Sequence, residues 1–188
     1  MNVVDRVLSF WFQEEVLDLA ADGDYRIAWF KKNDTFDKAI KDQFQSDVIA
    51  AATGKYNTLQ KTVEGVLALT LLLDQFPRNI YRGSPKAFAT DALALNIAKS
   101  AIANGLDESL GKTRRMFLYL PFEHSESLSD QNIAVRLFRG LNDERSYTYA
   151  LEHYYIISQF GRFPGRNKAL GRDTTPEELD FLKLFGSY

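Results

Sequence analysis

Apolar residues recur every three or four positions along most of the chain, the spacing that places them on one face of an α-helix. From this pattern we expect helices over residues 3–12, 35–53, 63–75, 85–104, 112–120, 129–140, 145–160 and from 176 onward. The segment 63–75 is apolar on nearly all sides, which is typical of a central helix covered by its neighbours. Residues 14–24 are polar and predict a loop, and residues 25–30 predict a short helical turn.

Capping residues indicate where these helices begin. Asp34 or Thr35 is expected to cap the second helix and Thr62 the third, because such side chains accept hydrogen bonds from free backbone N–H groups. Ser84 followed by proline predicts the start of the fourth helix, and Thr175 opens the last one with the spacing of a capping box. The prolines expected to end the helices before them are Pro77 and Pro121.

The same pattern predicts an all-α fold. No segment alternates apolar and polar residues with a period of two, so we expect no β-sheet. About eight helices joined by short loops favour an irregular array of helical hairpins, although no fixed-period sequence repeat accompanies them. Linkers rich in glycine, proline and serine are absent, so residues 1–188 are expected to form a single domain.

Composition and charge exclude several classes of function. The 188 residues carry a net charge of -2, which provides no general attraction for nucleic acid or an anionic membrane. There is no cysteine, so disulfides and thiolate chemistry are excluded. The longest apolar run, 66–73, is far shorter than the roughly 20 residues of a membrane helix. The N-terminus lacks the layout of a signal peptide, and we expect a soluble cytoplasmic protein whose sequence indicates no oligomeric state.

A motif with several polar residues begins in the last part of the strongly apolar helix expected at 63–75. It covers residues 71–83, Leu-Leu-Leu-Asp-Gln-Phe-Pro-Arg-Asn-Ile-Tyr-Arg-Gly. Asp74 lies at the expected C-terminal end of that helix, where the helix dipole disfavours an anion. A buried carboxylate there needs a cationic partner or hydrogen bonds. The partners that we consider are Arg78, Arg82, Arg162 and Arg166. Such a pair serves either to hold helix ends together or to form part of a polar site.

A second motif, Gln-Phe-Gly-Arg-Phe-Pro-Gly-Arg-Asn-Lys-Ala-Leu-Gly-Arg at residues 159–172, contains four basic residues and no acid. Three glycines there let the backbone approach a ligand, and arginine side chains suit carboxylates and phosphates. This composition predicts an anion pocket. The alternative is that these arginines neutralise buried acids such as Asp74 and Glu126, and arginine geometry serves both purposes equally well.

Both histidines are candidates for a role in the site. His124 follows the expected fifth helix and has carboxylates on either side, so it could exchange protons with Glu126 or Asp74. His153 lies on an apolar helix face, where it is either a ligand-binding residue or a core residue. A metal ion could use these groups, but no recognised ligand spacing is present, and we predict neither a metal nor a cofactor.

Three hypotheses about function remain open. The first is a binding protein whose arginine-rich pocket holds a small anionic ligand or the acidic end of a peptide. The second is a hydrolase or transferase for an anionic substrate, with His124 and Glu126 as an acid–base pair and Asp74 in support. The third is that the motifs are purely structural. The predicted ligand-binding residues are Gln75, Arg78, Asn79, Arg82, His153, Arg162, Arg166, Asn167 and Arg172.

Together with Phe-Leu-Tyr-Leu-Pro-Phe-Glu-His-Ser-Glu at residues 117–126, the two motifs resemble the domain-of-unknown-function 924 family, which is mostly bacterial. The resemblance covers nearly the whole chain. It implies an all-helical fold of the tetratricopeptide-repeat-like type and implies no established activity. One departure is Gly165, where the family often carries a histidine, and this departure weakens a mechanism that needs three histidines or a metal.

Overall fold

The computed structural model describes residues 1–13, 18–22 and 25–186, and every regular element in these ranges is a helix. The α-helices are α1 (Val3–Phe12), α2 (Asp34–Ala52), α3 (Val63–Thr70), α4 (Phe76–Ile80), α5 (Asp91–Ala103), α6 (Lys112–Glu123), α7 (Leu128–Gly140), α8 (Glu144–Phe160), α9 (Asn167–Leu170) and α10 (Pro176–Phe185). The shorter helical turns are η1 (Ile27–Trp29), η2 (Asn57–Lys61), η3 (Leu71–Gln75), η4 (Pro85–Ala87), η5 (Leu106–Ser109) and η6 (Pro164–Arg166). The predicted all-α class is confirmed, whereas the single domain and the tetratricopeptide-like arrangement stay predictions.

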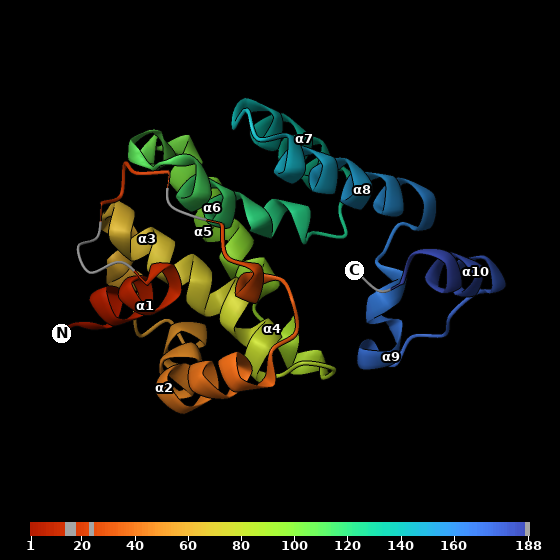
Figure 1. Ribbon diagram of the computed structural model, residues 1–188, viewed down its shortest axis with the longest axis horizontal. Helices are drawn as coiled ribbons and strands as arrows, with labels where there is room; N and C mark the ends of the chain where they lie inside the picture. Colours follow the sequence, from red (N-terminus) through yellow and green to blue (C-terminus); the bar gives the residue numbers. More distant parts are fainter. Residues whose placement is uncertain (14–17, 23–24, 187–188) are drawn as a thin grey trace.

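The rod formed by α3, η3 and α4 runs through the middle of the helical assembly (Figure 1). Helices α1 and α2 pack against this rod, and α5 and α6 cover another side of it. Helices α7 and α8 pair with each other and extend from α6. The C-terminal helices α9 and α10 follow the end of α8, across from α4 (Figure 1). None of the helices in the described part of the chain is both long and apolar enough to cross a bilayer.

Aromatic rings fill the space between α1, η1, α4 and α6. The buried indole of Trp11 has its ring centroid 6.1 Å from that of Trp29 and 5.4 Å from those of Phe76 and Phe117. The Trp29 indole nitrogen donates to the main-chain oxygen of Trp11 at 3.0 Å. These contacts anchor the predicted turn at residues 25–30 against the core. A second, smaller apolar cluster joins α8 to the C-terminal segment and contains Ile156, Ile157, Phe160, Phe163 and Phe181.

The prediction that Pro77 and Pro121 end helices is wrong. At Pro77 the π-helical turn η3 widens the backbone, and the Phe76 N–H donates to the main-chain oxygen of Leu71, five residues back. The helix therefore continues into α4, with Pro77 in its first turn, where a missing N–H costs little. Helix α6 likewise runs through Pro121 and ends at Glu123. Because both helices continue past their prolines, polar residues that the sequence places after a helix lie on the helix itself.

Two predicted helix starts are also corrected. The N-cap of α2 is Asn33, whose side chain accepts from the Phe36 N–H at 3.1 Å, and Asp34 is the first helical residue. Ser84 caps only the short turn η4, and α5 begins at Asp91. By contrast, Thr62 caps α3, and Thr175 caps α10 with a complete capping box, as predicted. The later start of α5 places Asp91 next to the polar motif on α4.

Replacing Gly65 by alanine is expected to destabilise the protein, although alanine is the better helix former. A Cβ at Gly65 would lie 2.1 Å from the main-chain oxygen of Leu59, and a backbone atom cannot move aside easily. We expect a loss of about 1–3 kcal/mol in the free energy of unfolding, typical of overpacking. Denaturant unfolding measures it. Gly140→Ala is the matched control, because nothing lies within 4 Å of its Cβ, and there we expect a gain of about 0.5–1 kcal/mol.

Candidate functional site

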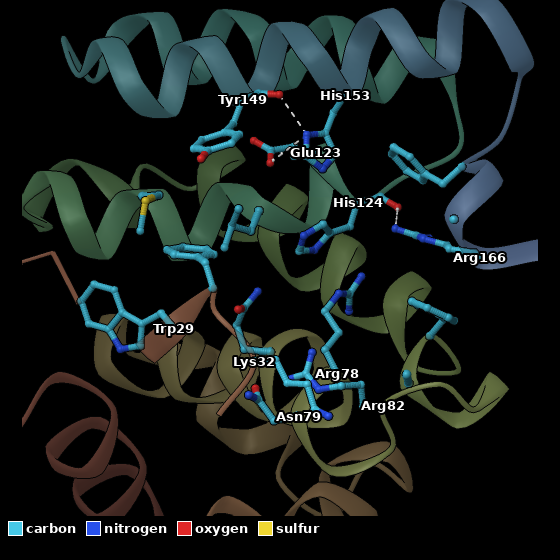
Figure 2. Close-up of a pocket in the computed structure, with 18 of the residues that line it drawn as sticks. Trp29, Lys32, Arg78, Asn79, Arg82, Glu123, His124, Tyr149, His153 and Arg166 are labelled. Atoms are coloured by element: carbon cyan, nitrogen blue, oxygen red, sulfur yellow. Dashed lines mark hydrogen bonds and ion pairs between the residues drawn. The ribbon is translucent and has the colours of Figure 1, made fainter. Parts of the chain in front are cut away.

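A cavity of about 670 Å³ lies where η1 with its flanking residues, the η3–α4 rod, the end of α6, helix α8 and the turn η6 come together (Figure 2). Its polar lining comprises Lys32, Gln75, Arg78, Asn79, Arg82, Glu123, His124, Arg145, Ser146, Tyr149, His153 and Arg166. Its larger apolar lining residues are Tyr25, Trp29, Phe30, Phe88, Met116, Leu120, Phe138 and Phe163. In Figure 2, Trp29 and Tyr149 lie toward one end, and Arg78, Arg82 and Arg166 toward the other. We call the first the aromatic end, where Arg145 also lies 4.6 Å from the centroid of the Tyr25 ring that packs on Trp29, and the second the cationic end.

Asp74 lies in η3, directly behind the cavity wall, and is completely buried. One carboxylate oxygen is 2.7 Å from Nδ1 of His124 and 3.2 Å from Nη1 of Arg78. The other accepts from Nε2 of Gln75 at 2.5 Å. Burial by itself would raise the pKa of Asp74, but the Arg78 charge and the hydrogen bonds outweigh it and hold the pKa below its usual range. Asp74 is therefore an anion with every partner supplied by neighbouring side chains.

Arg78 and Arg82 each hold a carboxylate from a different helix. Arg78 binds both oxygens of Asp91 at 2.9 and 3.0 Å, and it also donates to the main-chain oxygen of Asp74 at 2.7 Å. Arg82 binds both oxygens of Asp37 at 2.9 and 3.1 Å, and the amide of Asn79 donates to the same carboxylate at 2.7 Å. The carboxylates of Asp37 and Asp91 thus neutralise much of the positive charge at this end of the cavity.

Arg166 has weaker compensation. Its guanidinium lies between the rings of Phe88 and Phe163, 4.8 and 4.4 Å from their centroids. It donates to the main-chain oxygen of His124 at 2.9 Å, and its contact with Asp91, a carboxylate that Arg78 already binds, is 3.4 Å long. Burial, followed by the charge of Arg78, lowers the pKa of Arg166 to about 10, so it remains a cation at neutral pH. Two arginines therefore share the one carboxylate of Asp91.

Glu123 and His153 meet in the cavity wall as two neutral groups. Burial, followed by the charges of Asp74 and Glu152, raises the pKa of Glu123 to about 8, so it is largely protonated at neutral pH. Burial lowers the pKa of His153 to about 3. Nδ1 of His153 lies 2.9 Å from the main-chain oxygen of Tyr149 and 3.4 Å from the Glu123 carboxyl group. The contact between His153 and Glu123 therefore has the length of an ion pair but joins two uncharged side chains.

Glu126 does not line the cavity and is engaged by the C-terminal segment. Its carboxylate accepts from Arg172 at 2.8 and 3.0 Å and from the main-chain N–H of Phe163 at 2.9 Å. The sequence suggested Glu126 as the acid–base partner of His124. In the structure, the carboxylate that contacts the His124 ring is Asp74, because Glu126 already binds three N–H donors from the C-terminal segment.

Arg162 and Asn167 also hold the C-terminal segment in place. Arg162 binds Glu178 of α10 at 2.6 and 2.8 Å, and the Asn167 amide donates to the same carboxylate at 3.0 Å. The Asn167 side-chain oxygen accepts from Arg172 at 3.0 Å. These bonds tie η6, α9 and α10 to one another, and the bond from Arg172 to Glu126 ties them to the α6–α7 loop. Together they hold Arg166 against the cavity.

The predicted site residues therefore lie in three places: in the cavity lining, behind His124, and in the attachment of the C-terminal segment. Those that line the cavity are Gln75, Arg78, Asn79, Arg82, His124, His153 and Arg166. Asp74 lies behind His124, and the residues in the C-terminal attachment are Glu126, Arg162, Asn167 and Arg172. Gly165, where the sequence departs from the resembled family, also lines the cavity.

Sequence reasoning missed several groups that the structure brings to the site. Lys32 and Arg145 line the cavity but belong to no motif, so nothing in the sequence distinguishes them from other surface cations. Asp37 and Asp91 are acids in first helical turns, where acids are common for local reasons. For Glu123 the sequence did offer an indication of a site role, because this residue directly precedes His124. Within the described residues, no three His, Asp or Glu side chains are arranged to hold a metal ion.

Comparison with known proteins supports the resemblance based on the motifs. Residues 7–186 match the family described as "Bacterial protein of unknown function (DUF924)". The chain is similar to the solved structure of a protein of unknown function, ATU0120, from Agrobacterium tumefaciens, with 37% identity, 97% of each chain covered and a TM-score of 0.87. No curated protein matches the chain. Because the match extends over nearly its whole length, the chain belongs to the DUF924 family.

Proposed function

We propose that the protein binds a small organic anion with an apolar or aromatic body in this cavity. The observation that carries the proposal is the charge of the lining. Five cationic side chains line the cavity, namely Lys32, Arg78, Arg82, Arg145 and Arg166. The one carboxyl group among the described lining residues is Glu123, which is largely protonated at neutral pH.

Arg166 is the main candidate for contact with the anion. Arg78 and Arg82 each already bind both oxygens of a carboxylate through two guanidinium nitrogens. Arg166 shares Asp91 with Arg78 and reaches it through one long contact. A carboxylate or phosphate oxygen from a ligand would supply the acceptor that its guanidinium lacks. The flanking rings of Phe88 and Phe163 hold this guanidinium in place, so little side-chain entropy is lost on binding.

The aromatic end of the cavity indicates the chemistry of the uncharged half of the ligand. Trp29 lies toward this end (Figure 2), and the ring of Phe30, whose centroid is 6.5 Å from that of Trp29, adds to its apolar surface. A volume of about 670 Å³ falls within the range of sites for small organic molecules. The cavity therefore fits a molecule with one charged head and one apolar body better than it fits inorganic phosphate. The acidic end of a peptide with a terminal apolar side chain has the same chemistry.

Arg166→Gln is expected to weaken binding of such an anion at least tenfold, because a hydrogen bond to a charged group contributes about 1.5–3 kcal/mol. Phenylpropionate and phenyl phosphate are suitable probes, and phenylpropionamide is the uncharged counterpart. Thermal unfolding measures the stabilisation, which is about 2.7 kcal/mol at a ligand concentration 100 times Kd.

Arg136→Gln is the matched control, because it removes the same charge from an exposed position on α7 that does not line the cavity. We expect it to bind the probes as the unmodified protein does. Equal stabilisation by the anions and by the amide would contradict the proposal, as would equal binding by the two arginine variants.

A further inference from the structure

His124 is held with one ring nitrogen on Asp74 and its ring in the cavity wall. Because Asp74 is ionised and can only accept hydrogen bonds, Nδ1 of His124 carries the proton of the 2.7 Å bond between them. In the neutral ring, Nε2 then bears a lone pair. Within the described residues, no protein group forms a hydrogen bond with this second nitrogen, and His124 lines the cavity. The arrangement is that of a histidine base whose tautomer a buried carboxylate determines.

The surroundings keep this histidine in its basic form. Burial, followed by the charge of Arg78, lowers the pKa of His124, and the attraction of Asp74 only partly offsets this effect. The imidazole is therefore neutral at pH 7 and can take up a proton. Asp74 is completely buried and does not line the cavity, so it acts on a bound molecule only through His124.

A positive charge and a carboxylic acid line the same cavity as the His124 ring. The guanidinium of Arg166 donates to the main-chain oxygen of His124 at 2.9 Å, which ties a cation to the backbone of the same residue (Figure 2). Glu123 precedes His124 in the chain, lines the same cavity and is largely protonated at neutral pH. A negative charge that develops on a molecule in this cavity would therefore meet a cationic lining and a carboxylic acid.

Among the described residues, the serine next to His124 in the chain and the serine in the cavity lining both use their hydroxyls in hydrogen bonds. The Ser125 hydroxyl donates to Asp130 at 2.8 Å. The Ser146 hydroxyl, in the cavity wall, donates to Asp143. The chain contains no cysteine. With both serine hydroxyls engaged, we take water as the nucleophile that a base at His124 would activate.

We propose that the cavity hydrolyses carboxylic esters whose acyl part carries a second carboxylate, with His124 as the general base and Asp74 as its positioning residue. This inference rests on the proposed function, because the second carboxylate occupies the cationic end of the cavity. The oxygen of a water molecule forms a bond to the ester carbonyl carbon while its proton passes to Nε2 of His124. The bond from carbon to the alcohol oxygen then breaks, His124 returns the proton to that oxygen, and a dicarboxylate and an alcohol are released.

The test uses the full chain and the monoester of glutaric acid with p-nitrophenol, with p-nitrophenyl pentanoate as the uncharged ester and p-nitrophenyl phosphate as the phosphoryl analogue. We expect kcat/KM to be at least tenfold higher for the glutarate ester than for the pentanoate. His124→Gln should lower turnover about 10²- to 10⁴-fold, the usual contribution of general base catalysis. Ser125→Ala is the control, and its turnover should not change, because its hydroxyl faces Asp130.

Asp74→Asn keeps the side-chain volume and separates positioning from folding. We expect its kcat to fall at least tenfold with little change in KM, because the amide can donate to Nδ1 and favours the wrong tautomer of His124. Its pH profile should also change, since kcat/KM of the unmodified protein should fall in acid, as His124 becomes protonated. Thermal unfolding checks that each variant is folded, and a folded variant with an unaltered profile would contradict the role of Asp74.

Three results would overturn the catalytic inference: glutarate ester hydrolysis no faster than in buffer, equal hydrolysis by His124→Gln, or preferred hydrolysis of the phosphate. Thermal unfolding with glutarate and phenylpropionate then separates the two proposals. If these anions stabilise the protein and no ester is hydrolysed, anion binding stands and catalysis fails. If these anions do not raise the unfolding temperature and no ester is hydrolysed, both proposals fail.

Discussion

Asp74→Ala is expected to lower the free energy of unfolding by about 3–5 kcal/mol, the usual effect of removing one partner of a buried ion pair. The carboxylate is completely buried, and its removal leaves donors from Gln75, Arg78 and His124 facing the interior of a helical rod. Arg78 keeps Asp91, so the loss falls mainly on the other two donors and on the unbalanced charge. Urea unfolding at pH 7 measures the difference.

Asp42→Ala provides the surface comparison for this experiment. Asp42 pairs with Lys38 one helical turn away, and its side chain is 57% exposed, so its removal should cost no more than about 0.5 kcal/mol. A loss below about 1 kcal/mol for Asp74→Ala would contradict a structural role for the network. Its polar groups would then have to be explained by the ligand alone.

Glu123→Gln is expected to stabilise the protein at neutral pH and to have little effect in acid. The folded protein raises the pKa of Glu123 from its ordinary value of 4.5 to about 8, chiefly by burial. Between these two values the unfolded chain has lost the proton, while the folded chain retains it. Stability therefore falls as the pH rises through this window, by about 1.4 kcal/mol for each pH unit. Glutamine keeps the shape and has no proton to lose.

The measurement compares the two proteins by denaturant unfolding at pH 5 and pH 7. We expect the advantage of Glu123→Gln to grow by about 2–3 kcal/mol between these values. His153, whose pKa burial lowers to about 3, is present in both proteins, so its own titration largely cancels in the comparison. Glu108→Gln is the control, because Glu108 is exposed, and its effect should be small at both pH values. An advantage that does not vary with pH would contradict a protonated Glu123.

The helices could be predicted from the sequence because their signals are local. The repeat of apolar residues, the threonine that caps α3 and the capping box of α10 each involve residues within a few positions of one another. The prolines could not be interpreted in the same way. Phe76 and Phe122 next to them are buried, and their packing outweighs a lost backbone hydrogen bond. Burial of that kind depends on other helices, so residues near the proline do not reveal it.

The chemistry of the candidate site could be predicted in type but not in pairing. The sequence indicated that Asp74 needs a cation and that arginines cluster near the other end of the chain. It could not indicate that Arg78 and Arg166 share Asp91, which is 75 positions away from Arg166. Every arginine can bind every acid, so the choice depends on which helices meet. The same reason explains why Glu126 binds Arg172 rather than serving His124.

The amino-acid sequence by itself determined the all-helical class, the polar motifs and the need of a buried acid for a partner, because these follow from residue type and short-range spacing. Only the tertiary structure decided that η3, the end of α6 and η6 face one cavity, and that Glu123 and His153 lose their charges there. Burial and long-range neighbours determine those charges, and both exist only after the helices have packed. The same packing holds Nδ1 of His124 on Asp74, leaves its ring in the cavity wall and places Arg166 on the main-chain oxygen of the same residue.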